Sequence, residues 1–595
     1  MEIPFLILGF TGSIGAGCST LADIITRTSP SALVKRKQFY ENAINDMKNI
    51  SNKMKKVTSE EVLEQCNKQL RALYHQRSYL RILQQVTDPK FIYVSMSAII
   101  IKLVIETMDI AEFDKWSNQS SELSGILKVF RAKWIETIQS YNEREKNFGN
   151  LSDSELNIID EMFKELDEIR KKITEIELRD FFNNKIDALH LQTFGNNLRK
   201  TGNAFITEDS FGNLKNLPLI ATEVNKYIKY YRNRTDNKKA NCFIVDAFRN
   251  PAEVEFFRRY DQFFLISLYA SEETRRTRLE KTILGGSLHE PENFADIFRK
   301  INERDWGDDS NIKDLHKQNV SRCFYMADIA INNNDTNSEF DSKLFQKFLR
   351  YYALIASPGC IQPTKEETFM NLAYSLSLRS SCISRKVGAV VTDKAGFVLG
   401  VGWNDVAHGQ IGCGLRQKED FLKESKLFSM GLFEELFSEE DLKQYTKYDS
   451  ICFKDVLSEN KIKEKIAKTN LKQNEKEAVL RVLNIKRLEY CRSLHAEENA
   501  ILQVATRGGM GVHGGEIYTT TFPCELCAKK IYQSGITRIY FTEPYPNSIS
   551  EKVFLKDGIR HIKIRQFEGV KSFSYFKLYK TLYDKKEAQK IDDLL

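Results

Sequence analysis

Two short segments constrain this chain more than any other part of it: a His-Ala-Glu that begins at His495 and a Pro-Cys-Glu-Leu-Cys that ends at Cys527. The residues around each segment predict the start of a helix, so His495, Cys524 and Cys527 can converge on one ion. One imidazole and two thiolates suit zinc and leave a fourth position for water. Zinc brings the pKa of such a water close to neutrality, and Glu497 can then accept its proton and hand it on.

Two other uses of these residues compete with a catalytic site. A closed structural zinc site would need a fourth Cys or His of its own, and Glu497 would then be incidental. A redox Cys-x-x-Cys pair would not need the His-Ala-Glu segment at all. The complete H-x-E…P-C-x-x-C pattern, with a predicted strand before its second half and a helix after each half, favours a zinc-dependent nucleobase deaminase.

The C-terminal half resembles the deoxycytidylate deaminase branch of the cytidine deaminase fold over about residues 365–570. The segment RSSCISRKVGAVV is similar to that family's opening stretch, and GVGWNDVAHG to its Gly-Tyr-Asn-Gly segment, with Trp403 at the usual tyrosine. The resemblance implies an α/β/α domain in which Asn404 contacts the deoxyribose and the backbone of Ala496 meets the pyrimidine carbonyl. A turn residue is the alternative role for Asn404.

Three further cysteines bear on a second metal site. Some members of this family carry a structural zinc, and the resemblance implies that Cys382, Cys413 and Cys491 would hold it here, with His408 as a further candidate. Separate buried thiols are the equally ordinary alternative for these cysteines.

The length of the chain requires more than one domain. At 595 residues it is too long for one hydrophobic core. The segment SPGCIQPTKEE, at about residues 357–367, is the best linker, which predicts a first domain over 1–357 and a second over 358–595. Within the second domain, residues 416–487 are rich in charged, helix-forming residues and are expected to form a long insertion.

The first domain is predicted to be an α/β fold with a parallel sheet. An apolar run at residues 4–10 is followed by a Gly-rich turn and a helix. The segments NCFIVDAFRNP, YDQFFLISLYA and ADIAINNN predict further buried strands separated by helices. Strands that alternate with helices favour parallel pairing. Residues 31–203 are charged and helical in period, so we expect a large helical insertion there.

The Gly-rich turn matches the P-loop pattern G-x-x-x-x-G-K-[ST] except that Cys18 stands at the lysine. Its glycines and the following helix can hold phosphate oxygens with backbone N–H groups, and Ser19 or Thr20 can reach Mg²⁺. Without the lysine we expect an NTP or dNTP to bind, but not efficient phosphoryl transfer. A tight turn is the alternative. The loop residues are Gly12, Ser13, Ile14, Gly15, Ala16, Gly17, Cys18, Ser19 and Thr20.

Other polar residues of this half are candidate ligand contacts in a domain that resembles the nucleoside-monophosphate kinases. Asp246 ends a predicted strand and is followed closely by Arg249. Three more arginines are candidate phosphate contacts, although a solvated helix face is the alternative for each: Arg199, Arg275 and Arg278.

The order of the two halves resembles that of bacterial anti-phage dCTP/dCMP deaminases, in which a P-loop kinase-like domain precedes a deoxycytidylate deaminase-type domain. The resemblance implies zinc-dependent hydrolysis of dCTP or dCMP to dUTP or dUMP, which depletes the cytosine deoxynucleotide pool, under regulation by the first half. The runner-up is a cytosine or adenine deaminase that acts on single-stranded DNA or tRNA. A nucleotide kinase, disfavoured by Cys18, and a non-catalytic nucleotide sensor, disfavoured by the intact His495 and Glu497, are further alternatives.

Composition sets the expected cellular context. The chain is 42% hydrophobic and 28% charged, as in ordinary soluble proteins, and its net charge of +7 is too weak to require a nucleic acid. The opening residues lack the basic region of a signal peptide, and Lys102 interrupts the longest apolar run. We therefore expect a cytoplasmic protein with reduced cysteines and no membrane contact. Homo-oligomerisation and an unidentified inhibitor complete the expectations about partners.

Overall fold

The computed structural model of the chain divides into two compact units, Met1–Gln362 together with Glu568–Leu595, and Pro363–Phe567. The described residues run from 5 to 581 and leave out the segments 28–37, 88, 107–109, 119–120, 146–152, 183–189, 207–213, 233–240, 285–293, 308–313, 335–339, most of 422–490, 509–510 and 546–547. The insertion predicted at 416–487 therefore lies largely outside the described residues.

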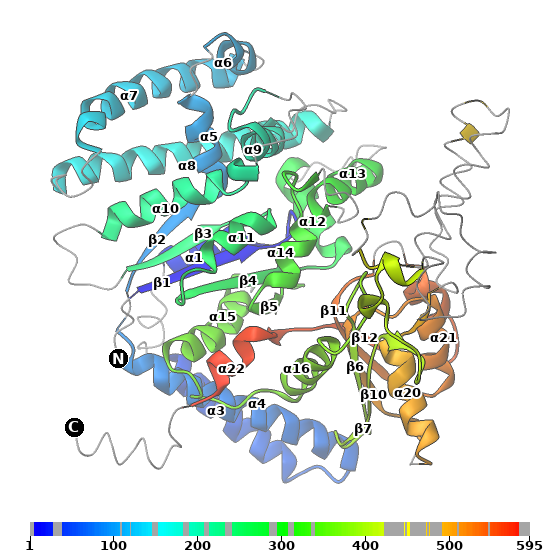
Figure 1. The fold of residues 1–595 in the computed structure, drawn as a ribbon. Coiled ribbons are helices and arrows are strands. Elements are labelled where there is room, and N and C mark those ends of the chain that lie inside the picture. The colour runs from blue at the N-terminus through cyan, green and yellow to red at the C-terminus, as the bar shows by residue number, and fades with distance from the viewer. Residues whose placement is uncertain are drawn as a thin grey trace. The chain divides into compact units, whose positions relative to one another are not determined.

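A six-stranded sheet organises the first unit (Figure 1). Five of its strands are parallel in the order β2-β3-β1-β4-β5, and β13 pairs antiparallel with β5 at the edge. The parallel α/β sheet predicted for this half is therefore present. The strands are β1 (Phe5–Thr11), β2 (Lys90–Ser95), β3 (Asn241–Asp246), β4 (Phe263–Tyr269), β5 (Ile329–Asn332) and β13 (Gly569–Val570).

Alternate residues of the strands face two different helical layers. In β1, Ile7 packs into one buried cluster, whereas Leu6 and Leu8 pack into the other, as the two-residue period of a strand requires. The first layer includes α5 (Met96–Ile105), α7 (Ser121–Glu145), α8 (Asp153–Phe182), α9 (His190–Thr201), α10 (Leu219–Arg232), α11 (Pro251–Phe257) and α14 (Val320–Met326). The second includes α1 (Cys18–Arg27), α3 (Gln38–Met54), α4 (Glu60–Gln85), α15 (Phe340–Ala356) and α22 (Phe573–Tyr579).

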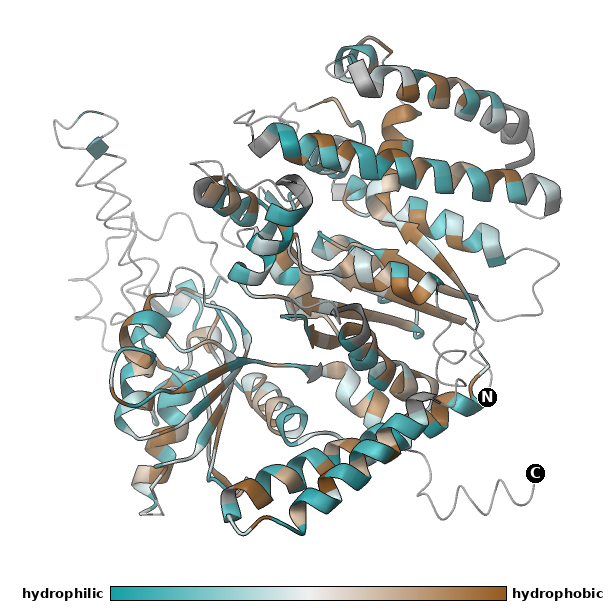
Figure 2. Cartoon of the chain, turned by 180° about the vertical axis from the view of Figure 1, so that it is seen from behind, coloured by the Kyte–Doolittle hydropathy of each residue, from teal (hydrophilic) through white to brown (hydrophobic). Residues whose placement is uncertain are grey.

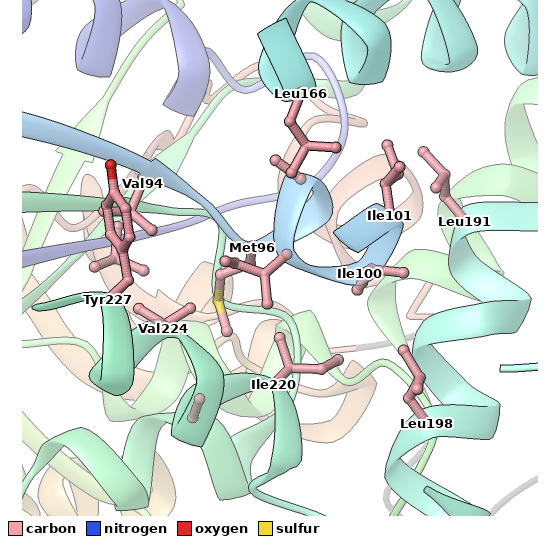
Figure 3. Packing of buried hydrophobic residues seen from close by; sticks show 14 of the residues in the cluster. Val94, Met96, Ile100, Ile101, Leu166, Leu191, Leu198, Ile220, Val224 and Tyr227 are labelled. Carbon is pink, nitrogen blue, oxygen red and sulfur yellow. The ribbon is translucent and has the colours of Figure 1, made fainter. Parts of the chain in front are cut away.

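Figure 3 shows the centre of the first layer, where α5 is surrounded by its neighbours. Ile100 and Ile101 of α5 lie among Leu166 of α8, Leu198 of α9 and Ile220 of α10. This core explains why the charged region around α5 still folds: α8, α9 and α10 each turn an apolar stripe towards the apolar α5. Helix α6 (Ile110–Ser117) adds Phe113 and Trp116 to the first layer. The remaining helices of the unit are α12 (Glu272–Leu284) and α13 (Phe294–Trp306).

Two predictions about this unit are corrected by the structure. The helical insertion expected at 31–203 contains strand β2, which pairs with β3, so the region is not helical throughout. Residues 568–595 were predicted to belong to the second domain, but Gly569 and Val570 extend the first unit's sheet, and Ser574 Oγ donates a 2.7 Å hydrogen bond to Asp328. The division at Gln362 falls inside the predicted linker.

The second unit is a three-layer α/β/α sandwich around a five-stranded sheet, ordered β12-β11-β10-β6-β7. Strands β6 and β7 pair antiparallel as a hairpin, while β10, β11 and β12 are parallel. Helix α16 covers one face, and α20 and α21 pack on the other (Figure 1). The elements are α16 (Lys365–Ser377), β6 (Gly388–Thr392), β7 (Val398–Trp403), β8 (Asp405–Val406), β9 (Ser493–Leu494), α20 (Ala496–Thr506), β10 (Glu516–Thr521), α21 (Glu525–Gln533), β11 (Arg538–Glu543) and β12 (Lys563–Gln566).

Hydropathy follows the same division between strands and helices. In Figure 2 the central strands are mostly hydrophobic, whereas the helices alternate hydrophobic and hydrophilic residues along their length. No helix among the described residues is both long enough and apolar enough to cross a membrane.

Candidate active site

Two helix N-termini bring the predicted metal ligands together. His495 is the N-cap residue of α20, and Cys524 is the N-cap residue of α21. The Nδ1 atom of His495 lies 3.2 Å from Cys524 Sγ and 3.4 Å from Cys527 Sγ. All three ligand atoms lie within 4.8 Å of one another, and no other such group of His, Cys, Asp or Glu occurs among the described residues.

The electrostatics of this trio suit a cation. A hydrogen bond from Cys527 and the neighbouring His495 lower the pKa of Cys524 to about 4, so this sulfur is a ready thiolate. The N-terminus of α21 adds the positive end of its helix dipole at the same sulfur. One imidazole and two thiol sulfurs, with room left for a further ligand, fit a zinc ion of the catalytic type.

Glu497 lies beside the trio and is only 4% exposed. Its Oε2 atom accepts a 3.7 Å hydrogen bond from Cys527 Sγ. Burial raises the pKa of Glu497 to about 7, and the charge of His495 opposes that rise. A carboxyl group with this pKa can both accept and release a proton near neutral pH, as general acid–base catalysis requires.

The His495 side of the site is fixed by residues that the sequence analysis did not single out. Glu498 accepts a hydrogen bond from the backbone N–H of His495 and forms an ion pair with Lys530. Asn499 Nδ2 donates to the carbonyl of Trp403 across 2.8 Å. The sequence could have indicated the role of Glu498, because this residue stands at the third position of the helix, where the acidic residue of a capping box is found.

Strand β7 lies very close to the first turn of α20, and this contact fixes the position of that turn. A Cβ atom at Gly402 would overlap the carbonyl oxygen of Ala496, so only glycine permits this spacing. The short strands β8 and β9 then pair antiparallel, with Asp405 opposite Leu494. Asn404 directly precedes β8 and His495 directly follows β9, so this pairing brings the two residues close together in the fold.

The Asn404 side chain is buried and anchors the segment before β6. Its Oδ1 atom accepts a hydrogen bond from the backbone N–H of Val387, and its Nδ2 atom donates to the carbonyl of Arg385, both at 2.7 Å. Asn404 thus holds a loop in place. Its predicted contact with deoxyribose would use the second Nδ2 hydrogen or the remaining lone pair.

The residues considered for a second zinc are near one another but do not form a compact ligand set. Burial raises the pKa of Cys413, and the thiols of Cys382 and Cys491 add to that effect, while Arg492 opposes it. The three do not form a close group like the one at His495, and His408 is exposed. The second zinc stays a prediction.

In the first unit, the Gly-rich loop links β1 to α1 as expected. Gly15 and Gly17 take positive φ values of 78° and 100°, which are open to glycine. Ser19 Oγ donates to Asp246 Oδ2 across 2.6 Å, and Tyr93 donates to the same oxygen across 3.2 Å. Asp246 Oδ1 is buried without a hydrogen-bond partner among the described residues. An orphaned carboxylate oxygen beside Ser19 fits Mg²⁺, which prefers oxygen ligands.

The three arginines predicted as phosphate contacts in this unit form hydrogen bonds or ion pairs with the protein itself. Arg275 donates to the carbonyl of Ile14 at 3.4 Å, and Arg278 to that of Gly15 at 2.9 Å, so both hold the loop by its oxygens. Arg199 forms a buried 2.8 Å ion pair with Glu253. These three arginines were predicted as phosphate contacts or solvated residues, and the structure gives them structural partners instead.

A carboxylate of the protein itself lies against the loop. Asp305, at the end of α13, is fully buried, and its Oδ2 atom accepts a 2.9 Å hydrogen bond from the backbone N–H of Ile14. Arg249 pairs with the other oxygen of Asp305. At Cys18, burial and the charge of Asp246 raise the thiol pKa, so this side chain is neutral and does not replace the missing lysine.

Comparisons with known proteins agree with the geometry of the second unit. The family model for the cytidine and deoxycytidylate deaminase zinc-binding region matches residues 363–543. The deoxycytidylate deaminase of Enterobacteria phage T2 is 30% identical over 186 residues, which cover 30% of this chain and 81% of that protein. ComE operon protein 2 of Bacillus subtilis (strain 168) is 40% identical over 73 residues, 12% of this chain and 38% of that protein.

Solved structures are similar as well, and one example follows. The dCMP deaminase from the cyanophage S-TIM5, in apo form, is 19% identical, with 35% of this chain and 100% of that chain covered and a TM-score of 0.19.

Proposed function

Because this chain belongs to the cytidine and deoxycytidylate deaminase family, we propose that its Pro363–Phe567 unit hydrolytically deaminates a free cytosine deoxynucleotide. The substrate is dCMP, dCTP or both, and the products are the uracil nucleotide and ammonia. The observation that carries the proposal is the position of Glu497, buried and within 3.7 Å of Cys527 Sγ, beside the only close His/Cys group of the described residues.

The residues present divide the work of this reaction. His495, Cys524 and Cys527 would hold a zinc ion, which when bound supplies Lewis-acid activation of water. Glu497 takes the proton that water loses as its oxygen adds to the amino-bearing ring carbon. It passes that proton to the ring nitrogen, then takes the second proton from the new hydroxyl group and passes it to the amino group, which leaves as ammonia as the C–N bond breaks and the carbonyl forms.

The first turn of α20 offers a contact for the pyrimidine ring. The first N–H groups of any helix have no partner within that helix, so the N–H of Ala496 is available to an acceptor. A pyrimidine carbonyl oxygen at this place would fix the ring beside Glu497. The close packing against Gly402 holds this N–H in position.

The test is a deamination assay that compares dCMP, dCTP, CTP, single-stranded DNA and tRNA, with zinc measured in the same preparation. We expect turnover of a free deoxynucleotide and about one zinc equivalent at the trio. Turnover of single-stranded DNA or tRNA alone would favour the polynucleotide deaminase instead. Absence of turnover with every substrate, in zinc-loaded protein, would remove the proposal.

For the first unit we propose binding of an NTP or dNTP, with Mg²⁺, at residues 12–20. Support comes from the parallel strands whose carboxyl ends carry the loop and Asp246, which is where open α/β sheets bind ligands. The neutral Cys18 argues for binding without efficient transfer. We also propose that this unit regulates deamination and that the protein depletes deoxycytidine nucleotides during phage infection. Both proposals rest on the order of the two domains. A phage challenge of cells carrying Glu497→Gln tests that role.

A further inference from the structure

The chain that follows strand β11 returns to the turn that carries Cys524. Strands β10 and β11 are parallel, and Thr521 at the end of β10 lies opposite Glu543 at the end of β11. The N–H of Phe522 then donates a hydrogen bond to the carbonyl of Glu543 across 2.8 Å. Both strands therefore end at the same edge of the sheet, where residues 548–550 bond to the residues around Cys524.

Ser550 holds the residue before Cys524. Its side chain is fully buried, and its Oγ atom donates a 2.8 Å hydrogen bond to the carbonyl of Pro523. The backbone N–H of Ser550 donates to Ser548 Oγ across 3.2 Å, and the two Oγ atoms lie 2.7 Å apart. A buried carbonyl is costly to leave without a donor, so the hydroxyl of Ser550 fixes the position of Pro523.

Ser548 and Ile549 hold the residue after Cys524. The Oε1 atom of Glu525 accepts a 2.9 Å hydrogen bond from Ser548 Oγ and a 3.0 Å hydrogen bond from the backbone N–H of Ile549. Glu525 is the first residue of α21, and Cys524 is its N-cap. Residues 548–550 therefore fix the chain on both sides of Cys524.

Cys524 depends on such support more than Cys527 does. Cys527 lies within α21, where the helical backbone limits the directions of a side chain. Cys524 has an extended backbone with φ of −69° and ψ of 174°, and its carbonyl accepts a 2.8 Å hydrogen bond from the N–H of Ala528 in the first helical turn. The direction of the Cys524 sulfur therefore depends on how the two flanking residues are held.

The supporting segment is itself anchored in the second unit. The short helix η7 (Glu551–Leu555) directly follows Ser550, and Leu555 is fully buried in the core of this unit. Lys529 of α21 lies over the ring of Phe554 at 4.8 Å. Residues 548–550 therefore have a fixed position from which to hold the turn at Cys524.

We propose that Ser550, Ser548 and Glu525 position the sulfur of Cys524 for zinc. The inference rests on the proposed deaminase function, in which Cys524 is a zinc ligand. The three residues act through the backbone on either side of Cys524, so they are positioning residues. A ligand that is already in place need not be ordered when the ion binds, and outer contacts of this kind change metal affinity by about ten- to a hundredfold.

The experiment measures the zinc affinity of the full chain by competition with a chromophoric chelator. The absorption spectrum of the cobalt(II) form is recorded as well, because it reports the geometry of the bound thiolates. We expect Ser550→Ala and Glu525→Ala to lower zinc affinity by about tenfold or more and to change the cobalt spectrum. Glu525→Gln should stay close to the wild type in both measurements, because its amide oxygen can still accept the two hydrogen bonds.

Ser534→Ala is the matched control, at the other end of the same helix. Ser534 Oγ donates a 3.0 Å hydrogen bond to the carbonyl of Ile531, so this variant also removes a hydroxyl from a main-chain carbonyl. We expect its zinc affinity to stay within about twofold of the wild type. Circular dichroism identifies any variant that has lost the fold. Glu525 is partly exposed, so Glu525→Ala decides the question where Ser550→Ala does not fold.

Unchanged zinc affinity with an unchanged cobalt spectrum in folded Ser550→Ala or Glu525→Ala would overturn the inference. An equal loss in Ser534→Ala would also overturn it, and an equal loss in Glu525→Gln would assign the effect to charge instead of hydrogen bonds. A wild type that binds zinc but deaminates no cytosine nucleotide would end the proposed deaminase function, and the zinc measurements would still decide this inference. A wild type that binds no zinc at the trio would end both.

Discussion

The carboxylate of Asp305 accepts a hydrogen bond from the backbone N–H of Ile14 across 2.9 Å and pairs with Arg249 through its other oxygen. In a phosphate-binding loop, such an N–H is available to a phosphate oxygen. Here an internal anion already holds it, and the same anion pairs with the partly buried Arg249. Asp305 therefore competes with a bound phosphate for both Ile14 and Arg249.

Asp305→Asn is expected to tighten binding of inorganic tripolyphosphate and of a dNTP to the full chain. The substitution removes a negative charge that repels the phosphate and releases Arg249 to contact it. Both effects should strengthen binding, by about tenfold in affinity. Calorimetric titration of wild type and variant measures the change. Weaker or unchanged binding in Asp305→Asn would show that Asp305 is only a structural partner of the loop. Because the substitution also leaves the partly buried guanidinium of Arg249 with a weaker partner, we expect the first unit to unfold at a lower temperature.

Glu497→Gln is expected to retain zinc and to lose deamination by about a hundredfold or more, the usual scale for a general acid–base residue. The amide keeps the shape of the side chain but cannot accept and return a proton. Metal analysis and a dCMP assay on the same protein measure both properties. Cys524→Ala is the contrasting variant, since it removes a ligand and should lower zinc content as well as activity. Wild-type turnover by Glu497→Gln would exclude Glu497 from the mechanism.

Glu177 predicts a pH dependence of the first unit's stability. Burial raises the pKa of Glu177 to about 8, opposed by the N–H groups of Leu191 and His190, one of which donates to its Oε1 at 3.0 Å. Between the ordinary pKa of a glutamate and about pH 8, Glu177 therefore keeps its proton in the folded state and releases it in the unfolded state. The stabilisation is complete below that ordinary value and is lost as pH rises towards 8.

Glu177→Gln should remove this dependence, because the amide oxygen can still accept from Leu191 and carries no charge. We expect the variant to unfold at a higher temperature than wild type at pH 8 and at a similar temperature at pH 5. Thermal unfolding followed by circular dichroism at the two pH values gives the comparison. A constant difference between variant and wild type at both values would contradict the proton linkage.

Local patterns predicted the second unit well, since its motif residues lie at the ends of clearly periodic elements. The helix starts at His495 and Cys524 each follow from a short segment. Strand β2 was missed because KFIYVS runs directly into the apolar MSAIIIKLVI, without a turn residue to separate strand from helix. Its edge position next to β3 depends on a partner about 150 residues away.

Other features depend on contacts that no local pattern encodes. Asp305 meets Ile14 across 291 residues, and β13 pairs with β5 across a whole intervening unit. Arg199, by contrast, was a plausible phosphate ligand in the sequence, and its burial against Glu253 reveals a structural role.

Gly17 tests whether the loop of the first unit binds phosphate at all. Its φ of 100° lies in the region that favours glycine, and it directly precedes the first residue of α1. Gly17→Val would strain this turn and place a branched side chain where phosphate oxygens approach the backbone. We expect the full chain to lose tripolyphosphate and dNTP binding, while zinc content stays at the wild-type level because the metal ligands belong to the other unit. If the first unit regulates deamination, kcat or KM for dCMP should also lose its response to added dNTP. Gly125→Val, at a helix position where a Cβ meets no atom within 4 Å, is the matched control for a branched residue elsewhere in the same unit. Normal binding in Gly17→Val, or an absence of binding in the wild type, would reduce the loop to a tight turn between β1 and α1.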